Sequence, residues 1–138
     1  MIAFVAVVIL GGAGVTAFWA TYHTSSEAPT PTSAERGLIS LEPFVVNLAD
    51  PGGSRFLRVS VRVIVESVEQ AERIKKSDVM LTRARSAILE LLTQQTADQL
   101  VTAEGKAALK AAIAEKIEPM LEETKVVDVL FSDFVVQF

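Results

Sequence analysis

The side chains that could support catalysis or metal binding are few in this sequence. The 138-residue chain contains one histidine, His23, and no cysteine. A single histidine cannot build a histidine-rich metal site, and without cysteine neither a thiolate-bound metal nor a disulfide framework can form. His23 directly follows Tyr22 at the end of an apolar run, a position that gives no convincing catalytic triad.

Carboxylate pairs and glycine-rich turns give no stronger signal. Asp128 and Asp133 are five residues apart in a stretch that alternates like a β-strand, which predicts that they lie on opposite faces and share no proton. The GGAG at 11–14 lacks the GK[ST] ending of a phosphate-binding loop, and no helix follows the GGS at 52–54. We therefore predict no catalytic residue, no metal site and no cofactor, and we expect that the protein is not an enzyme.

The charged residues indicate a mildly acidic part that begins only after an uncharged stretch. The formal net charge is -4, and the first charged residue is Glu27. Lysine and arginine form no continuous basic stripe, whereas nucleic acid binding depends on clustered cations that release counterions. Nucleic acid is therefore not an expected partner.

The uncharged stretch from Ile2 to Tyr22 is predicted to cross a membrane as one helix within residues 1–22. A helix of this length covers roughly 30 Å, about the thickness of the hydrocarbon core of a bilayer. The rival interpretation is a cleaved signal peptide, but no lysine or arginine precedes the run, and the run exceeds the usual apolar core of such peptides. The predicted anchor residues, which contact membrane lipid, are Ile2, Phe4, Val8, Leu10, Val15, Phe18, Trp19 and Tyr22.

Residues 23–37 have the composition of a linker. Serine, threonine and two prolines, Pro29 and Pro31, are typical of a solvated and partly stiff segment. Fully extended, such a segment spans roughly 45–50 Å. Residues 38–138 then form one folded domain.

The start of that domain has the period-two pattern of strands. FVVNLA at 44–49 is predicted to be a short buried strand, and DPGGS at 50–54 supplies turn residues. The following stretch places Val59, Val61, Val63 and Val65 on one face, so we expect a second strand and an antiparallel hairpin.

The rest of the domain is predicted to contain two helices and a closing strand. Ser67 and Gln70 match a capping box that opens one long helix, with Glu69–Arg73 and Glu72–Lys76 pairs, ending near Thr96. A second helix is expected from Thr102 to about Pro119, and 126–138 is expected to be a core strand. The predicted fold class is α/β (α+β), an antiparallel sheet packed against two helices after an N-terminal transmembrane helix.

Asp78 and Arg85 lie on the flank of the apolar stripe of the first helix. They are about 10 Å apart along the helix axis. One interpretation is that both side chains extend from the margin of the core into solvent. The other is that they form a polar seam against a neighbouring subunit, and they are therefore our candidate oligomer interface.

Three stretches resemble the family of FliL, the flagellar basal-body-associated protein. LEPFVVNLADPGGSRFLRVSVRV at 41–63 is similar to the opening of the family's periplasmic domain, and LVTAEGKAALKAAI at 100–113 matches a second motif. VVDVLFSDFVVQF at 126–138 is similar to the family's ending. With the predicted span and linker, the resemblance covers nearly the whole chain.

The resemblance implies a single-pass protein of the bacterial inner membrane, at the flagellar basal body, with its C-terminal domain in the periplasm. It implies a stomatin/prohibitin (SPFH)-like domain that forms a homo-oligomeric ring around the stator units, contacts other basal-body components, and supports torque and swimming or swarming motility. The linker residues nearest a partner emerging from the bilayer, and thus the candidate stator-facing segment, are Pro29, Pro31, Glu35 and Arg36. The alternative from the residues alone is a periplasmic adaptor or scaffold of another inner-membrane transport or secretion complex.

Overall fold

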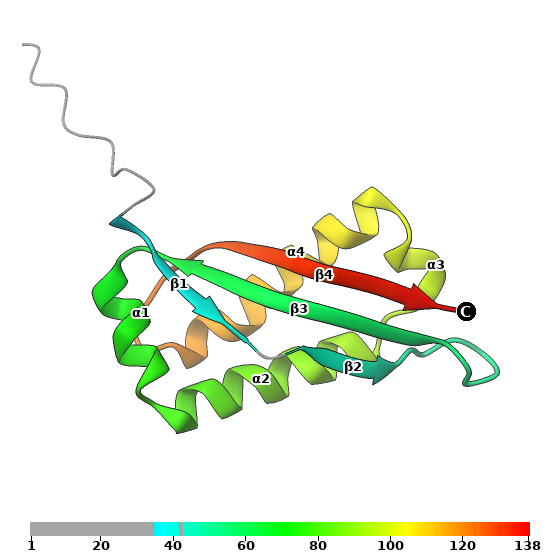
Figure 1. The fold of residues 1–138 in the computed structure, drawn as a ribbon, viewed down its shortest axis with the longest axis horizontal. Helices are drawn as coiled ribbons and strands as arrows, with labels where there is room; N and C mark the ends of the chain where they lie inside the picture. The colour runs from blue at the N-terminus through cyan, green and yellow to red at the C-terminus, as the bar shows by residue number, and fades with distance from the viewer. Residues whose placement is uncertain (1–34, 42) are drawn as a thin grey trace, which may run out of the picture. The chain divides into compact units, whose positions relative to one another are not determined.

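The sheet is built around one long strand, β3 (Phe56–Val65), which pairs on both edges (Figure 1). The computed structural model describes residues 35–41 and 43–138. Strand β4 (Val126–Gln137) runs antiparallel along the whole of one edge of β3. Strands β1 (Gly37–Ser40) and β2 (Phe44–Asn47) run antiparallel along the other edge.

Strands β1 and β2 together form one edge of the sheet in two pieces. β1 pairs with the C-terminal half of β3, and β2 pairs with the N-terminal half. The Leu41 N–H still donates to the Val61 carbonyl at 3.0 Å, so the pairing extends one residue beyond β1. Pro43, which has no N–H to donate, lies between the two pieces.

The predicted hairpin of β2 and β3 is confirmed. The pairing continues past β2, because Leu48 N–H donates to the Arg55 carbonyl at 2.9 Å. The turn contains Gly52 at φ 101° and Gly53 at φ 69°. Both values lie in the left-handed region that glycine adopts without steric cost, which explains why this turn carries two glycines.

The core lies between one face of the sheet and the helices. Alternate residues of β3 are buried on that face, as the period-two pattern predicts, and the helices are seen on one side of the sheet (Figure 1). An antiparallel sheet commonly covers one face in this way and leaves the other in solvent. The fully buried side chains of the core include Leu57, Val59, Val61, Ile74, Ile88, Leu92, Leu100, Leu109, Ile113 and Ile117.

The single long helix predicted after Ser67 is wrong, because the structure has two helices there. They are α1 (Val68–Lys75) and α2 (Asp78–Thr93). Lys76 ends the first, and Ser77 begins the second by accepting a hydrogen bond from the Met80 N–H at 3.3 Å. The side-chain oxygen of serine can accept a hydrogen bond from a backbone N–H in place of a helical carbonyl, so serine favours the start of a helix over its interior.

The ion pairs predicted on α1 also differ in the structure. Ser67 caps α1 by accepting from the Gln70 N–H at 3.2 Å, but the predicted capping box is incomplete, because the buried Gln70 Oε1 has no hydrogen-bond partner. However, Glu72 pairs with Lys75 at 3.0 Å, three residues away. Arg73 instead donates to the Glu122 carbonyl and the Thr124 hydroxyl, both at 3.2 Å, and so ties α1 to the turn before β4.

The second predicted helix is confirmed as α4 (Ala103–Ile117). Thr102 caps it by accepting from the Gly105 N–H at 2.9 Å. A short helix that was not predicted, α3 (Ala97–Leu100), precedes it. Pro119 lies in a short 3-10 helix, η2 (Glu118–Met120), where α4 ends.

The closing strand is confirmed, but it is not regular. β4 carries irregularities opposite Ser60/Val61 and Ile64/Val65 of β3, where it contains one extra residue each time. Asp128 pairs with Ile64 and Asp133 pairs with Ser60, two residues of β3 that are four apart. The prediction that these aspartates lie on opposite faces is therefore wrong, because the bulge at Ser132 brings both to the face away from the helices.

The predicted membrane helix, with Ile2, Phe4, Val8, Leu10, Val15, Phe18, Trp19 and Tyr22, lies outside the described residues, as do Pro29 and Pro31. Within the described part of the chain, no helix has the length and apolar character needed to cross a bilayer.

Candidate protein-contact surfaces

The face of the sheet turned away from the helices is one candidate contact surface; we call it the outer sheet face. Its central residues are Arg58, Ser60 and Arg62 of β3, which the register places between β1 or β2 on one side and β4 on the other. The residues around them that lie on this face are Leu38, Val45, Phe56, Asp128, Leu130, Asp133 and Val135.

The outer sheet face combines apolar and charged side chains in neighbouring rows. Val45 is 68% exposed and lies beside Arg58, which lies beside Val135 at 47% exposed. Val45 and Val135 thus lie on either side of Arg58, so apolar and charged side chains alternate across this face. A broad face of this kind suits a protein partner better than a small molecule, which binds in concave sites.

Asp78 and Arg85, the candidate oligomer interface, lie two turns apart on α2. Asp78 is exposed in the first turn of the helix, where a carboxylate also interacts favourably with the helix dipole. Arg85 is half-buried, with its guanidinium carbon 4.9 Å from the centre of the Phe44 ring. The structure thus places Asp78 at the surface and packs Arg85 against β2.

Of the candidate linker residues, Glu35 and Arg36 are described. Both are exposed and directly precede β1. The next residue, Gly37, is buried, and a Cβ atom there would overlap the Ser67 carbonyl and Ala71. The chain therefore enters the domain by passing close to the start of α1, and only glycine fits at that point.

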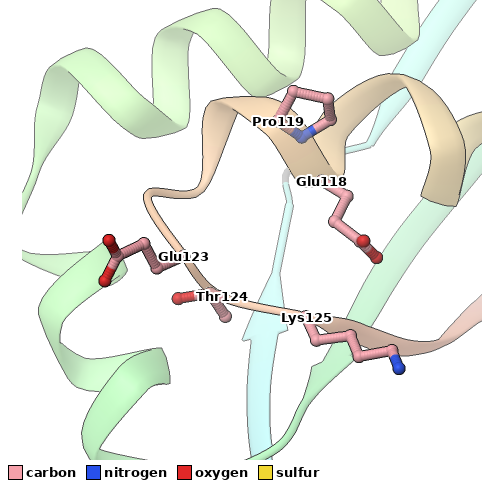
Figure 2. A pocket seen from close by; sticks show the side chains of 5 residues that line it. All are labelled: Glu118, Pro119, Glu123, Thr124 and Lys125. Atoms are coloured by element: carbon pink, nitrogen blue, oxygen red, sulfur yellow. The ribbon is translucent and has the colours of Figure 1, made fainter.

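One open hollow, of about 530 Å³, lies beside the turn between η2 and β4 (Figure 2). Its lining includes the Glu118 and Glu123 side chains, which point in different directions in Figure 2. The Glu118 carboxylate already accepts from the Val126 N–H at 3.1 Å. The Glu118 and Glu123 carboxylates therefore do not converge on one point in the hollow.

The turn beside this hollow has an unusual backbone. Glu122 and Glu123 have φ values of 42° and 60°, which side-chain-bearing residues rarely adopt. Arg73 and the buried Thr124 hold the turn through the hydrogen bonds described above. Within residues 35–41 and 43–138, no group of three or more histidine, cysteine or carboxylate side chains is arranged to hold a metal ion.

Sequence reasoning missed Asp50, the most buried charged side chain of an ion pair in the described domain. Its side chain is 6% exposed, and one oxygen accepts from Arg55 at 3.0 Å. The other oxygen accepts from the Ala97 N–H at 2.9 Å, at the start of α3. Asp50 was interpreted only as a turn residue, because no local pattern links it to a helix 47 residues later.

These observations define the class of the protein. It is a small α+β domain in which an antiparallel sheet packs against helices on one face, and the other face carries exposed apolar and charged side chains. The family model described as "Flagellar basal body-associated protein FliL" matches residues 38–137, from the first strand of the sheet to the last. The chain belongs to the FliL family, as the three sequence stretches predicted.

Two relatives agree with this assignment. The chain is 32% identical over 113 residues to the flagellar protein FliL of Aquifex aeolicus (strain VF5), covering 80% of this chain and 68% of the relative. It is 24% identical over 130 residues to the flagellar protein FliL of Bacillus subtilis (strain 168), covering 92% and 89%. The family assignment associates the protein with the flagellar basal body and motility.

Proposed function

We propose that this protein is a non-enzymatic, single-pass inner-membrane component of the flagellar motor whose periplasmic domain forms a ring around the stator units and supports torque. The observation that carries the proposal is the family match, which spans the whole sheet-and-helix domain. The domain is proposed to be of the stomatin/prohibitin type. Nothing in its described part favours a different transport or secretion complex.

The membrane part of the proposal concerns residues 1–37. Residues 1–22 would hold the domain at a fixed depth, and the linker 23–37 would set its distance from the bilayer. Glu35 and Arg36 are exposed just before β1. Together with Pro29 and Pro31, they would face a stator unit that emerges from the membrane. The tether would raise the effective concentration of the domains, so weak lateral contacts would suffice for assembly.

The ring would be built from heterologous contacts, in which two different surfaces of each domain meet. The start of α2 offers Asp78 and the exposed Val79, whereas the outer sheet face offers Arg58 and Arg62. Asp78 and the two arginines have opposite charge, and both surfaces include exposed apolar side chains. We propose that α2 of one copy contacts the outer sheet face of the next, with Arg85 held in place by Phe44 at the edge of the contact.

The experiment is a mass measurement on the full chain extracted from membranes in mild detergent, alone and with purified stator units. The proposal predicts a closed oligomer of uniform size, with a further mass increase when stator units are present. A protein that stays monomeric under both conditions would rule out the ring.

A further inference from the structure

Strand β4 has an open edge. Among the described residues it pairs only with β3, and no helix or strand pairs with its other side. An unpaired edge is a template for the addition of another strand. The opposite edge of the sheet differs, because it consists of two four-residue strands with Pro43 between them.

The hydrogen-bond pattern tells which residues of β4 direct their backbone groups to the open edge. The Val61 carbonyl of β3 points toward β1, since it accepts from Leu41. Backbone directions alternate along a strand, so Ser60 points toward β4 and its partner Asp133 points back. Asp133 and Val135 direct their N–H and C=O groups toward β3. Phe134 and Val136, which alternate with them, therefore direct theirs toward the open edge.

The side chains of these same residues lie on the helix-covered face, where α4 leaves them partly exposed. Phe131, Phe134 and Val136 are only partly buried against the core. The Lys106 amino group of α4 lies 5.2 Å from the centre of the Phe134 ring, and that of Lys110 lies 5.5 Å from the Phe131 ring. The open edge is thus flanked by an apolar row of β4 and two lysines of α4, a border that we call the β4–α4 edge.

The lysines at the β4–α4 edge favour an acidic strand of a partner protein over a second copy of this chain. The acidic side chains of β4, Asp128 and Asp133, lie on the outer sheet face. If two copies paired β4 against β4 about a two-fold axis, the helices would lie side by side and their Lys106 and Lys110 side chains would face each other. Like charges at such a seam disfavour that pairing, whereas carboxylates on an incoming strand would be favoured.

We propose that the β4–α4 edge is a docking site for an extended, acidic segment of a partner protein, which adds to the sheet as a strand beside β4. Its backbone would pair with Phe134 and Val136, its apolar side chains would cover Phe131 and Phe134, and its carboxylates would bind Lys106 and Lys110. This inference does not depend on the proposed ring, which uses the opposite face of the sheet and α2.

The test uses two short synthetic peptides, one alternating glutamate with valine and one alternating lysine with valine, added to the full chain in detergent. The expected result is binding of the acidic peptide only, with slower hydrogen exchange at the Phe134 and Val136 amides. The matched variants are Lys110→Glu and Lys116→Glu, which make the same charge change on two sides of α4. Lys116 lies on the α2 side, 3.8 Å from Glu90.

Lys110→Glu is expected to weaken binding about tenfold at low salt, and Lys116→Glu is expected to change it less than about twofold. Lys106→Glu serves as a second variant with the same expected loss, should Lys110→Glu disturb the fold as judged by circular dichroism. Equal binding of both peptides, or equal effects of Lys110→Glu and the control Lys116→Glu, would overturn the proposal. Protection of the Phe134 and Val136 amides that rises with protein concentration alone would also overturn it, because a second copy would then occupy the edge.

Discussion

At the scale of single residues, the polar side chains that stand out serve to join distant parts of the chain. Asp50 connects the β2–β3 turn to α3, and Arg73 connects α1 to the turn before β4. Both contacts join residues more than forty positions apart. The sequence stretches that resemble the FliL family include Asp50 and Arg55, and the structure gives these two residues a role in the fold.

Replacing Asp50 by alanine should lower the free energy of unfolding by about 2 kcal/mol, because the Ala97 N–H loses its acceptor and Arg55 loses its main partner. Urea denaturation of the two proteins measures the difference. Asp98→Ala is the control, since Asp98 is 89% exposed and 3.5 Å from the same arginine. Its effect should stay below about 0.5 kcal/mol. Equal effects of the two variants would contradict the role given to Asp50.

Gly105→Ala is expected to destabilise the domain even though alanine is the better helix former. An added Cβ would overlap the Gln99 carbonyl and lie 2.9 Å from the Thr102 hydroxyl that caps α4. The overlap should cost about 2 kcal/mol in the free energy of unfolding, more than the gain of about 1 kcal/mol from the better helix propensity of alanine. Thermal denaturation should show the loss, whereas Glu104→Ala at the neighbouring exposed position should be close to neutral. A more stable Gly105→Ala variant would show that the close approach does not exist.

At the level of helices and strands, the sequence predicts whether a long segment is helix or strand better than it predicts breaks and bulges within that segment. Alternating valines identify β3 because that strand is covered on one side only. The break between α1 and α2 was missed because the apolar stripe continues across it, from Ile74 to Ala84, and Ser77 looks like any exposed helix residue. The bulge at Ser132 was missed because its position depends on the pairing with β3, which a single strand does not reveal.

Ser77→Ala tests whether Ser77 begins an independent helix. The Ser77 hydroxyl accepts from the Met80 N–H, so its removal should cost about 1 kcal/mol in the free energy of unfolding. Ser86→Ala, at an exposed position in the middle of α2, should have almost no effect or slightly stabilise the helix. If α1 and α2 behaved as one helix, the two variants would instead have similar effects in the same denaturation measurement.

At the scale of the whole molecule, the domain places different surfaces in different directions. The outer sheet face, the start of α2 and the β4–α4 edge are built from separate sets of residues, so the two proposed contacts do not compete for one surface. The sequence identified the family and the candidate residue Asp78. It did not identify the whole outer sheet face, because that face combines side chains from strands that are far apart in the chain. It also did not identify the β4–α4 edge, which depends on how β4 packs against α4.

Asp78→Lys is expected to weaken assembly while the domain stays folded. The substitution replaces an exposed carboxylate that we propose to face Arg58 and Arg62 of a neighbouring copy. Sedimentation in detergent should show a smaller average assembly, with an unchanged circular dichroism spectrum. Glu104→Lys makes the same charge change in the first turn of α4 and should leave assembly intact. Loss of helical signal in Asp78→Lys, or equal assembly of both variants, would contradict the proposed interface.

The most direct measurement of the central claim is photo-crosslinking in motile cells from position 36, with an identical probe at the exposed position 104 as control. We expect the probe at position 36, just before β1, to be crosslinked both to further copies of this protein and to a stator subunit, whereas the probe at position 104 should capture no stator. Crosslinks from position 36 that contain neither a stator subunit nor a second copy, in cells where the protein is present at the flagellar base, would contradict it.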